Sequence, residues 1–214
     1  MCQTSLICPL CGDNNISHYH RDSQRTYEQC AVCQLVFVPE QYQLTATQEK
    51  AVYDQHQNRP DDLGYRQFLD RLATPLLDLL SVPSVGLDFG CGPGPTLSLM
   101  LEEGGHQVAL FDPFYANNPA LLSRNYDFIT ASEVVEHLSQ PGFELDRLWQ
   151  LIKSGGLLGL MTKQVTDRAS FASWHYKNDP THISFFSKAT FSYLAEVWGA
   201  SLEYMGDDVI IFRK

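Results

Sequence analysis

The chain of 214 residues carries 15 basic and 25 acidic side chains, and its net charge of −10 disfavours nucleic-acid binding, which usually needs a basic patch. Hydrophobic residues make up 44% and charged residues 19%, so the chain is too apolar to be disordered and can form one domain with a small appendage. Its longest apolar runs fall short of the roughly 18 residues that indicate a transmembrane helix, and no signal-peptide pattern begins the sequence. We therefore expect a cytoplasmic protein without a membrane span.

Five of the six cysteines lie within the first 33 residues. Two Cys-x-x-Cys pairs, separated by residues 12–29, consist of Cys8, Cys11, Cys30 and Cys33. Each pair can direct two thiolates at one metal ion, and two pairs complete the closed tetrahedral site of a structural Zn²⁺. Cys2 falls outside this pattern, and His18 or His20 is an alternative ligand. Free thiol pairs or disulfides are the other interpretations, but paired spacing in a cytosolic chain favours zinc.

The predicted elements divide the chain into three parts. Residues 1–45 form a zinc-ribbon module with strands at 26–29 and 36–39. Residues 46–84 link it to the sheet, with a linker or loose helix over 40–62 and a helix from Leu63 onward, where apolar residues recur at helical spacing. The third part is residues 85–214. We predict its strands at 85–89, 107–111, 127–131 and 157–162, and its helices at 96–103, 143–152 and 189–197. A turn at 154–156, a loop at 163–182 and a hairpin of 202–205 with 209–212 complete it. This alternation predicts an α/β fold with a mostly parallel sheet and one antiparallel strand near the end.

The segment from Val85 to Gly94 carries the clearest signal, because glycines after a strand let the backbone approach a ligand closely. A dinucleotide fingerprint starting at Gly90 fails at its third glycine, where Pro95 stands. A phosphate-binding P-loop also fails, since no Gly-Lys-Ser/Thr follows. Asp88, just before the loop, would repel a phosphate and suits a cationic ligand.

Residues 87–94, Leu-Asp-Phe-Gly-Cys-Gly-Pro-Gly, resemble the first motif of class I S-adenosylmethionine-dependent methyltransferases. Residues 126–138 resemble the fourth strand and following helix of that family, and 151–156 resemble the turn before its fifth strand. The segment 180–187 is similar to one of a subfamily that resembles the quinol O-methylases, some of which carry an N-terminal two-knuckle zinc module. The resemblance implies a Rossmann-like methyltransferase fold for residues 85–214.

The resemblance also implies a set of cofactor contacts. These would come from Asp88, Gly90, Cys91, Gly92, Gly94, Asp112, Ser132 and Glu133. Asp88 would lie near the methionine end and Asp112 on the ribose, with a strand-end cap as the alternative for Asp112. Cys91 is more typical of a small packing residue than of a nucleophile, and Glu133 is alternatively an acid at a helix N-terminus. Only residues 113–126 separate the second strand from the next, so the family's usual third strand is shortened or lost, and its adenine contact is not assigned.

Methyl transfer from a sulfonium is an in-line displacement that needs positioning and often a base, and needs no metal. His137 and His182 are the candidates, because histidine titrates near neutral pH; the alternative for each is a packed side chain. The loop 163–182 and the ribbon are expected to help build the acceptor pocket.

Three functions compete. The first is methyl transfer to a small molecule. The second is methylation of rRNA or tRNA with the ribbon as an RNA grip, but residues 1–50 hold three basic and five acidic residues, and four thiolates on Zn²⁺ would add negative charge. The third is a non-enzymatic zinc-ribbon adaptor, against which the intact glycine loop and Asp112 argue. The sequence therefore favours a small-molecule methyltransferase.

Overall fold

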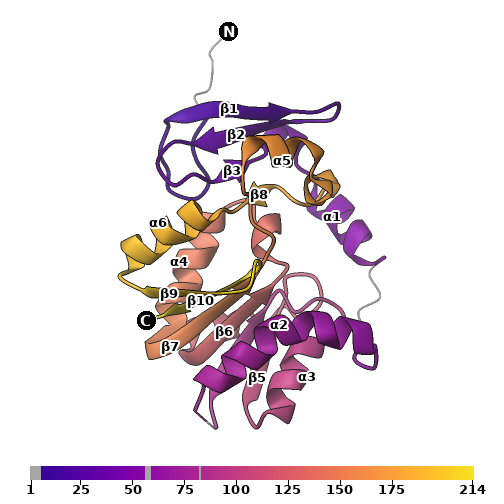
Figure 1. Ribbon diagram of the computed structural model, residues 1–214. Coiled ribbons are helices and arrows are strands. Elements are labelled where there is room, and N and C mark those ends of the chain that lie inside the picture. The colour runs from indigo at the N-terminus through magenta and orange to yellow at the C-terminus, as the bar shows by residue number, and fades with distance from the viewer. Residues whose placement is uncertain (1–5, 56–58, 82) are drawn as a thin grey trace.

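Two β-sheets organise the computed structural model, which describes residues 6–55, 59–81 and 83–214 (Figure 1). Cys2 lies outside the described residues. A six-stranded sheet has the order β5-β4-β6-β7-β10-β9, and a four-stranded sheet has the order β1-β2-β3-β8. No helix within the described ranges is long and apolar enough to cross a membrane.

The six-stranded sheet confirms the predicted α/β fold. Its strands are β4 (Val85–Phe89), β5 (Gln107–Phe111), β6 (Tyr126–Ser132), β7 (Ile152–Met161), β9 (Ser201–Met205) and β10 (Val209–Arg213). Strands β4 to β7 pair in parallel, and β10 pairs antiparallel with both β7 and β9. The sheet is therefore mostly parallel with one antiparallel strand, as the alternating pattern and the closing hairpin predict.

Helices cover both faces of this sheet (Figure 1). They are α2 (Leu63–Leu79) and α3 (Thr96–Glu103) on one face, and α4 (Pro141–Leu151) and α6 (Lys188–Trp198) on the other. Each pair closes its own hydrophobic cluster, one containing Leu72 and Leu101, the other Leu148 and Leu194. Ser187 begins α6 with a capping box, because its side chain accepts from the backbone N–H of Thr190.

The strand after β5 is lost, as the short spacing predicts. The stretch between β5 and β6 holds a bridge between Asp112 and Ala116 and a 3₁₀ helix, Pro119–Ser123. Proline removes a backbone donor and disfavours a regular strand. Strand β5 is therefore the edge of the sheet, and the end of β5 opens directly onto the cavity described below.

Three local predictions were wrong or incomplete. Residues 154–156 lie inside β7, where Gly155 has a φ of 78° and the pairing with β6 shifts register, so the expected turn is a bulge. The predicted loop 163–182 contains α5 (Arg168–Ser173) and a 3₁₀ helix, His175–Asn178. For residues 40–62 the helical alternative holds in part, because α1 (Ala46–Tyr53) begins there at a capping box of Thr45 and Gln48. Short polar helices of this kind lack the apolar periodicity that would announce them.

The four-stranded sheet joins distant parts of the chain. Its strands are β1 (Ile16–Arg21), β2 (Thr26–Cys30), β3 (Val36–Phe37) and β8 (Ser184–Phe185). Residues 6–38, which hold both cysteine pairs and β1 to β3, are called the ribbon below. The last strand, β8, pairs antiparallel with β3, so Phe185 lies opposite Val36. An aromatic cluster with Tyr27 and Phe171 packs between this sheet and α5.

The ribbon also contacts the six-stranded half through α4. The backbone N–H of Gly142 donates to the carbonyl of Pro9 over 3.2 Å. A Cβ atom at position 142 would lie 2.1 Å from the carbonyl oxygen of Leu10, which only glycine avoids. The first cysteine pair is therefore seated directly on the start of α4.

Candidate functional site

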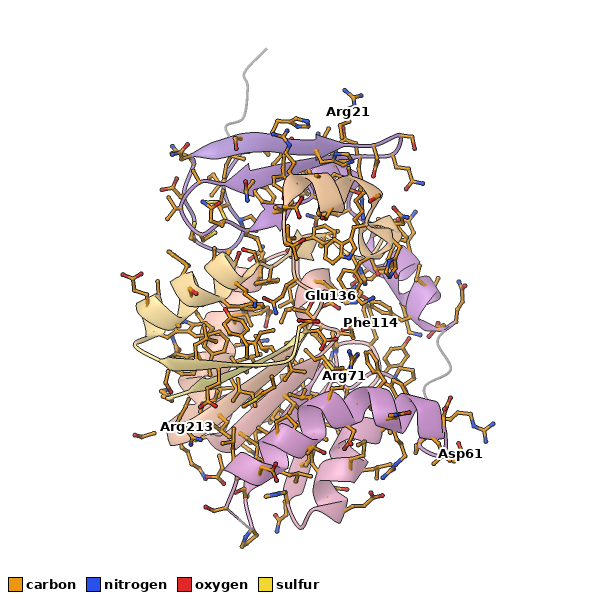
Figure 2. The ribbon with its side chains drawn as sticks, in the orientation of Figure 1. Arg21, Asp61, Arg71, Phe114, Glu136 and Arg213 are labelled. Carbon is orange, nitrogen blue, oxygen red and sulfur yellow. The ribbon has the colours of Figure 1, made fainter. Side chains whose placement is uncertain are left out.

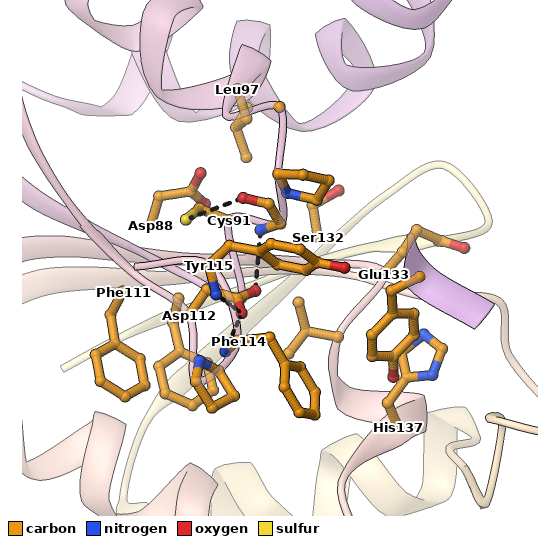
Figure 3. A pocket seen from close by; sticks show the side chains of 18 of the residues that line it. Asp88, Cys91, Leu97, Phe111, Asp112, Phe114, Tyr115, Ser132, Glu133 and His137 are labelled. Carbon is orange, nitrogen blue, oxygen red and sulfur yellow. Dashed lines mark hydrogen bonds between the residues drawn. The ribbon is translucent and has the colours of Figure 1, made fainter. Parts of the chain in front are cut away.

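A cavity of about 640 Å³ opens at the carboxyl ends of β4, β5 and β6 (Figure 3). Ligands of open α/β sheets bind at this edge. The cavity is lined by all ten residues that the sequence analysis selects for the cofactor and the base: Asp88, Gly90, Cys91, Gly92, Gly94, Asp112, Ser132, Glu133, His137 and His182. Residues from α1, α2 and α4 complete the wall, so segments from seven parts of the chain meet there.

The glycine loop between β4 and α3 needs glycine for two reasons. Gly90 and Gly92 have φ values of 74° and 63°, in the left-handed region that other residues rarely adopt. A Cβ at position 90 would lie 2.5 Å from a methyl carbon of Val134, whereas a Cβ at position 92 would meet no atom within 4 Å. The loop therefore presents open backbone to the cavity, which fits the cradle of a cofactor.

Asp112, directly after β5, holds the glycine loop in place through a hydrogen bond. Its Oδ2 accepts from the backbone N–H of Gly92 over 3.0 Å, and its Oδ1 accepts from Phe114 and Tyr115 (Figure 3). The carboxylate thus caps its own strand end and also lines the cavity. Carboxylate oxygens accept more than one hydrogen bond, so the side chain retains capacity for a ligand hydroxyl.

Asp88, at the end of β4, is a buried acid behind the loop. Its Oδ1 accepts from the hydroxyl of Thr130 over 2.8 Å. Burial and, to a smaller extent, the negative charge of Asp112 raise the pKa of Asp88 to about 7, although the hydrogen bond from Thr130 opposes this shift. A nearby cation would favour the ionised form of this carboxyl.

The carboxyl groups of Glu133 and Glu136 both lie at the hydroxyl of Tyr176. The hydroxyl of Tyr176 donates to Oε1 of Glu136 and lies 3.3 Å from Oε2 of Glu133. Burial raises the pKa of Glu133 to about 8 and that of Glu136 to about 7, and the charge of Glu136 adds to the shift of Glu133. Glu133 has a φ of 52°, a strained conformation for a residue other than glycine, and its N–H donates to Met161.

The two histidines lie side by side, with ring centres 4.7 Å apart. The Nδ1 of His182 lies 2.7 Å from the carbonyl of Tyr176, and the Nδ1 of His137 lies 3.2 Å from the carbonyl of Thr181. A carbonyl only accepts, so each Nδ1 donates, and a ring that is neutral then carries its lone pair at Nε2. Burial lowers the pKa of His182 to about 4, helped by the charge of His137. His182 is therefore neutral at physiological pH.

Several residues of this wall were missed from the sequence. Glu136 stands three residues after Glu133 and next to His137. This spacing of two acids and a histidine after a strand could have marked Glu136 as part of the site. Glu49 and Tyr53 come from α1, inside the segment interpreted as a linker, and no pattern there pointed to a ligand wall. Phe68 of α2 also lines the cavity, with its ring stacked on that of Tyr65, which lies ahead of the first strand in the sequence and was there a candidate cap for the cofactor, with a buried helix residue as the alternative.

Cys91 has no nucleophilic environment. Its side chain faces the carbonyl of Gly92, and burial raises the pKa of the thiol to about 12. A reactive cysteine needs a lowered pKa. The thiol therefore acts as a small neutral side chain of the loop.

The other four described cysteines form a second, separate cluster. Their sulfur atoms all lie within 4.8 Å of one another, with Sγ–Sγ distances of 3.4 Å between Cys8 and Cys33 and 3.5 Å between Cys11 and Cys30. All four are free thiols in the structure. Tetrahedral Zn²⁺ with bonds of about 2.3 Å places its sulfur ligands about 3.8 Å apart, so the donor set fits this ion closely.

Comparisons with known proteins agree with the fold. The structure resembles 1,6-didemethyltoxoflavin-N1-methyltransferase from Burkholderia thailandensis, with 16% identity, coverage of 92% of this chain and 99% of that chain, and a TM-score of 0.52. It also resembles magnesium protoporphyrin IX methyltransferase from Synechocystis PCC 6803, with 16% identity, coverage of 80% and 94%, and a TM-score of 0.54. Comparison with proteins of curated function gives no match. The family described as "Methyltransferase domain" matches residues 55–203, so the chain belongs to this family and is a methyltransferase.

Proposed function

We propose that the protein transfers the methyl group of S-adenosylmethionine to a small-molecule acceptor. The observation that carries this proposal is the meeting of the glycine loop, two strand-end acids and two histidines in one cavity. Both structural neighbours described above were solved with S-adenosylhomocysteine, the demethylated product. The bound cofactor would supply an electrophilic methyl group on a positively charged sulfur.

The cofactor side of the cavity would be formed by the loop and the two aspartates. Gly90, Gly92 and Gly94 line this side, Asp112 would accept from the ribose hydroxyls, and Asp88 would face the cationic methionine end. Ser132 and Glu133, at the end of β6, would complete this side. These roles follow from the resemblance and from the donor and acceptor atoms that each residue presents.

The acceptor side would be the wall that holds His137 and His182. Their Nε2 lone pairs are suited to receive a proton from the acceptor as it is methylated. The rings of Tyr53 and His137 are 5.3 Å apart, and Phe114 packs against Tyr53 over 5.9 Å, so this wall also carries aromatic surface. We infer an acceptor with an apolar or aromatic body and one acidic nucleophilic group.

The charge of the cavity argues for a small molecule over RNA. Its described lining includes six acidic side chains, those of Glu49, Asp88, Asp112, Glu133, Glu144 and Asp179, against one guanidinium, Arg147. An RNA acceptor would bring phosphates, and these are bound by basic side chains. The acidic lining would repel them.

The ribbon would hold one structural Zn²⁺ on Cys8, Cys11, Cys30 and Cys33. All four positions of a tetrahedral ion are then filled, so this metal would take no part in the reaction. We propose residues 1–45 as this zinc module, 46–84 as the connection and 85–214 as the methyltransferase unit, in a reducing compartment such as the cytoplasm.

Calorimetric titration with S-adenosylhomocysteine tests the proposed function. We expect one site per chain in the wild type and a loss of at least about tenfold in affinity for Asp112→Ala, because each charged hydrogen bond contributes about 1.5–3 kcal/mol. Asp78→Ala, on the exposed face of α2, is the matched control. Absence of binding by the wild type would refute the proposal.

A further inference from the structure

Helix α4 brings a carboxylate and a guanidinium to the wall of the cavity. Glu144 and Arg147 lie about one turn apart on this helix, and both line the cavity. Nη2 of Arg147 donates to Oε2 of Glu144. The Glu144 side chain is 24% exposed and that of Arg147 is 29% exposed, so a ligand in the cavity can reach both. The roles proposed above involve neither residue.

This pair lies at the edge where the sheet has lost a strand. Strand β5 is the edge strand, and the chain after it forms the bridge between Asp112 and Ala116 and the 3₁₀ helix Pro119–Ser123. Helix α4 contacts this 3₁₀ helix and shares a hydrophobic cluster with it through Leu145 and Leu121. At this edge the polar side chains that line the cavity therefore come from α4 and not from a further strand.

The cavity has an order that the cofactor can follow, if the roles proposed above hold for Asp88 and Asp112. Asp88 would face the methionine end and Asp112 the ribose. The ribose joins the amino-acid part of the cofactor to its adenine, so the adenine would lie on the opposite side of Asp112 from Asp88. In the view of Figure 3 the rings of Phe111 and Phe114 lie on that side of Asp112. The cavity therefore leads from the glycine loop past Asp112 toward α4.

Apolar side chains on this side suit a flat ring. The rings of Phe111 and Phe89 stack with their centres 5.4 Å apart, and both residues line the cavity. Pro113 and Leu138 line it as well. Bases stack on aromatic side chains whatever their sequence, so these residues would bind the faces of a base without distinguishing one base from another. Its identity has to be read at its edge, by polar groups.

We propose that Glu144 and Arg147 recognise the edge of the cofactor's adenine, an inference that rests on the function proposed above. Along its Watson–Crick edge adenine donates from the N6 amino group and accepts at N1. A carboxylate only accepts and a guanidinium only donates, so Glu144 matches the amino group and Arg147 matches N1. The bond between the two side chains uses one N–H group and one lone pair, and both groups have more to offer.

This arrangement selects adenine over hypoxanthine. Hypoxanthine carries an oxygen at position 6 and a hydrogen on N1, so its donor and acceptor are reversed. The oxygen would face the Glu144 carboxylate, and the N1–H group would face the Arg147 guanidinium. A site built to bind an amino group rejects an analogue that lacks it, because the polar group of the protein is then left unpaired.

Calorimetric titration of the full chain with S-adenosylhomocysteine and with S-inosylhomocysteine, its hypoxanthine analogue, tests this proposal. We expect the wild type to bind the adenine compound about tenfold or more tightly than the analogue. Glu144→Gln and Arg147→Met should each lower this preference by about threefold or more, because the first replaces a pure acceptor and the second removes the donor. Gln150→Ala, at an exposed position of α4, is the matched control and should retain both affinities.

The ratio of the two affinities separates recognition from a structural role. A variant that only loosens α4 weakens both compounds alike and leaves the preference unchanged. Equal binding of the two compounds by the wild type, or the full preference in both variants, overturns the adenine assignment and leaves the proposed function standing. If the wild type binds neither compound, the proposed function falls and the assignment falls with it. Should Arg147→Met not fold, Glu144→Gln decides.

Discussion

Arg25 of the ribbon donates a hydrogen bond from its guanidinium to the backbone carbonyl of Asp179, over 2.9 Å. The same buried side chain donates to the carbonyls of Lys177 and Pro180. These carbonyls belong to the turn that leads to His182. The ribbon therefore holds the segment that carries one of the two cavity histidines, although its cysteine cluster lies outside the cavity.

Arg25 is expected to act as a positioning residue. Arg25→Ala removes a hydrogen-bond donor from each of three carbonyls and should lower the free energy of unfolding by about 1–3 kcal/mol. It should also lower turnover with little change in S-adenosylhomocysteine affinity, and Arg25→Lys should restore part of the loss. Denaturant unfolding and calorimetry measure both effects. Arg21→Ala, at the exposed end of β1 (Figure 2), is the control, and an equal loss there would contradict the assignment.

The cysteine cluster is expected to hold one zinc ion per chain. Cys30→Ala should lose it and destabilise the ribbon, because so small a module has little core without its metal. Cys91→Ala should keep the zinc, since Cys91 lies in the glycine loop. Native mass spectrometry reads the metal content directly. A wild-type protein purified without zinc and still folded would rule the ribbon site out.

Asp88 is expected to make cofactor binding depend on pH. Its folded-state pKa of about 7 lies above the ordinary value of 3.8, so the folded protein holds a proton that the unfolded chain has lost between these pH values. This group's contribution to stability therefore falls as pH rises from about 4 to 7. The α-ammonium group of S-adenosylhomocysteine prefers the ionised carboxyl, so its affinity should rise from pH 6 to 8 if it lies near Asp88.

The control for this effect is Asp88→Asn, which removes the titrating group. Its affinity should be lower than that of the wild type at pH 8 and nearly constant across the same range. Calorimetry at several pH values gives the comparison. The same slope in both proteins would assign the pH dependence to another group.

His182 is expected to serve the reaction and not the cofactor. His182→Ala should lower turnover by about 100-fold or more, the contribution typical of a proton-transfer group, while cofactor affinity stays nearly unchanged. His18→Ala is the control, because His18 is an exposed histidine of the ribbon, whereas His106 is buried. Unaltered turnover in His182→Ala would remove this residue from the mechanism.

Gly142 is expected to govern the seating of the ribbon on α4. Gly142→Ala places a methyl group against the carbonyl of Leu10 and should displace the first cysteine pair. We expect a loss of stability of about 1–3 kcal/mol, as for overpacked contacts. Gly64→Ala, in the first turn of α2, is a milder control, since its Cβ would meet only a side-chain oxygen at 3.3 Å. If Gly142→Ala is as stable as the wild type, the contact with Leu10 can adjust to the methyl group, and this prediction is wrong.

Local sequence patterns determined the fold class and half of the candidate site. The strands β4 to β7 are short apolar runs, and the glycines after β4 announce a close approach of backbone to ligand. Asp88 lies at the end of β4 and Asp112 directly after β5, and a parallel sheet places these strand ends side by side, so their meeting at one cavity was predictable from the sequence. The spacing of the two cysteine pairs predicted that their four sulfur atoms lie together.

The sequence named His137 and His182 for the acceptor wall, but only the tertiary structure shows how its side chains meet. His182 reaches His137 because β8 joins the ribbon sheet and Arg25 holds the turn before it. Tyr176 stands between two glutamates because α5 packs beneath that sheet. Such contacts join residues that are far apart in the chain. They depend on how whole elements pack, and local periodicity or spacing does not predict that packing. The sequence by itself thus determined where a cofactor would lie, and packing decided what surrounds its acceptor.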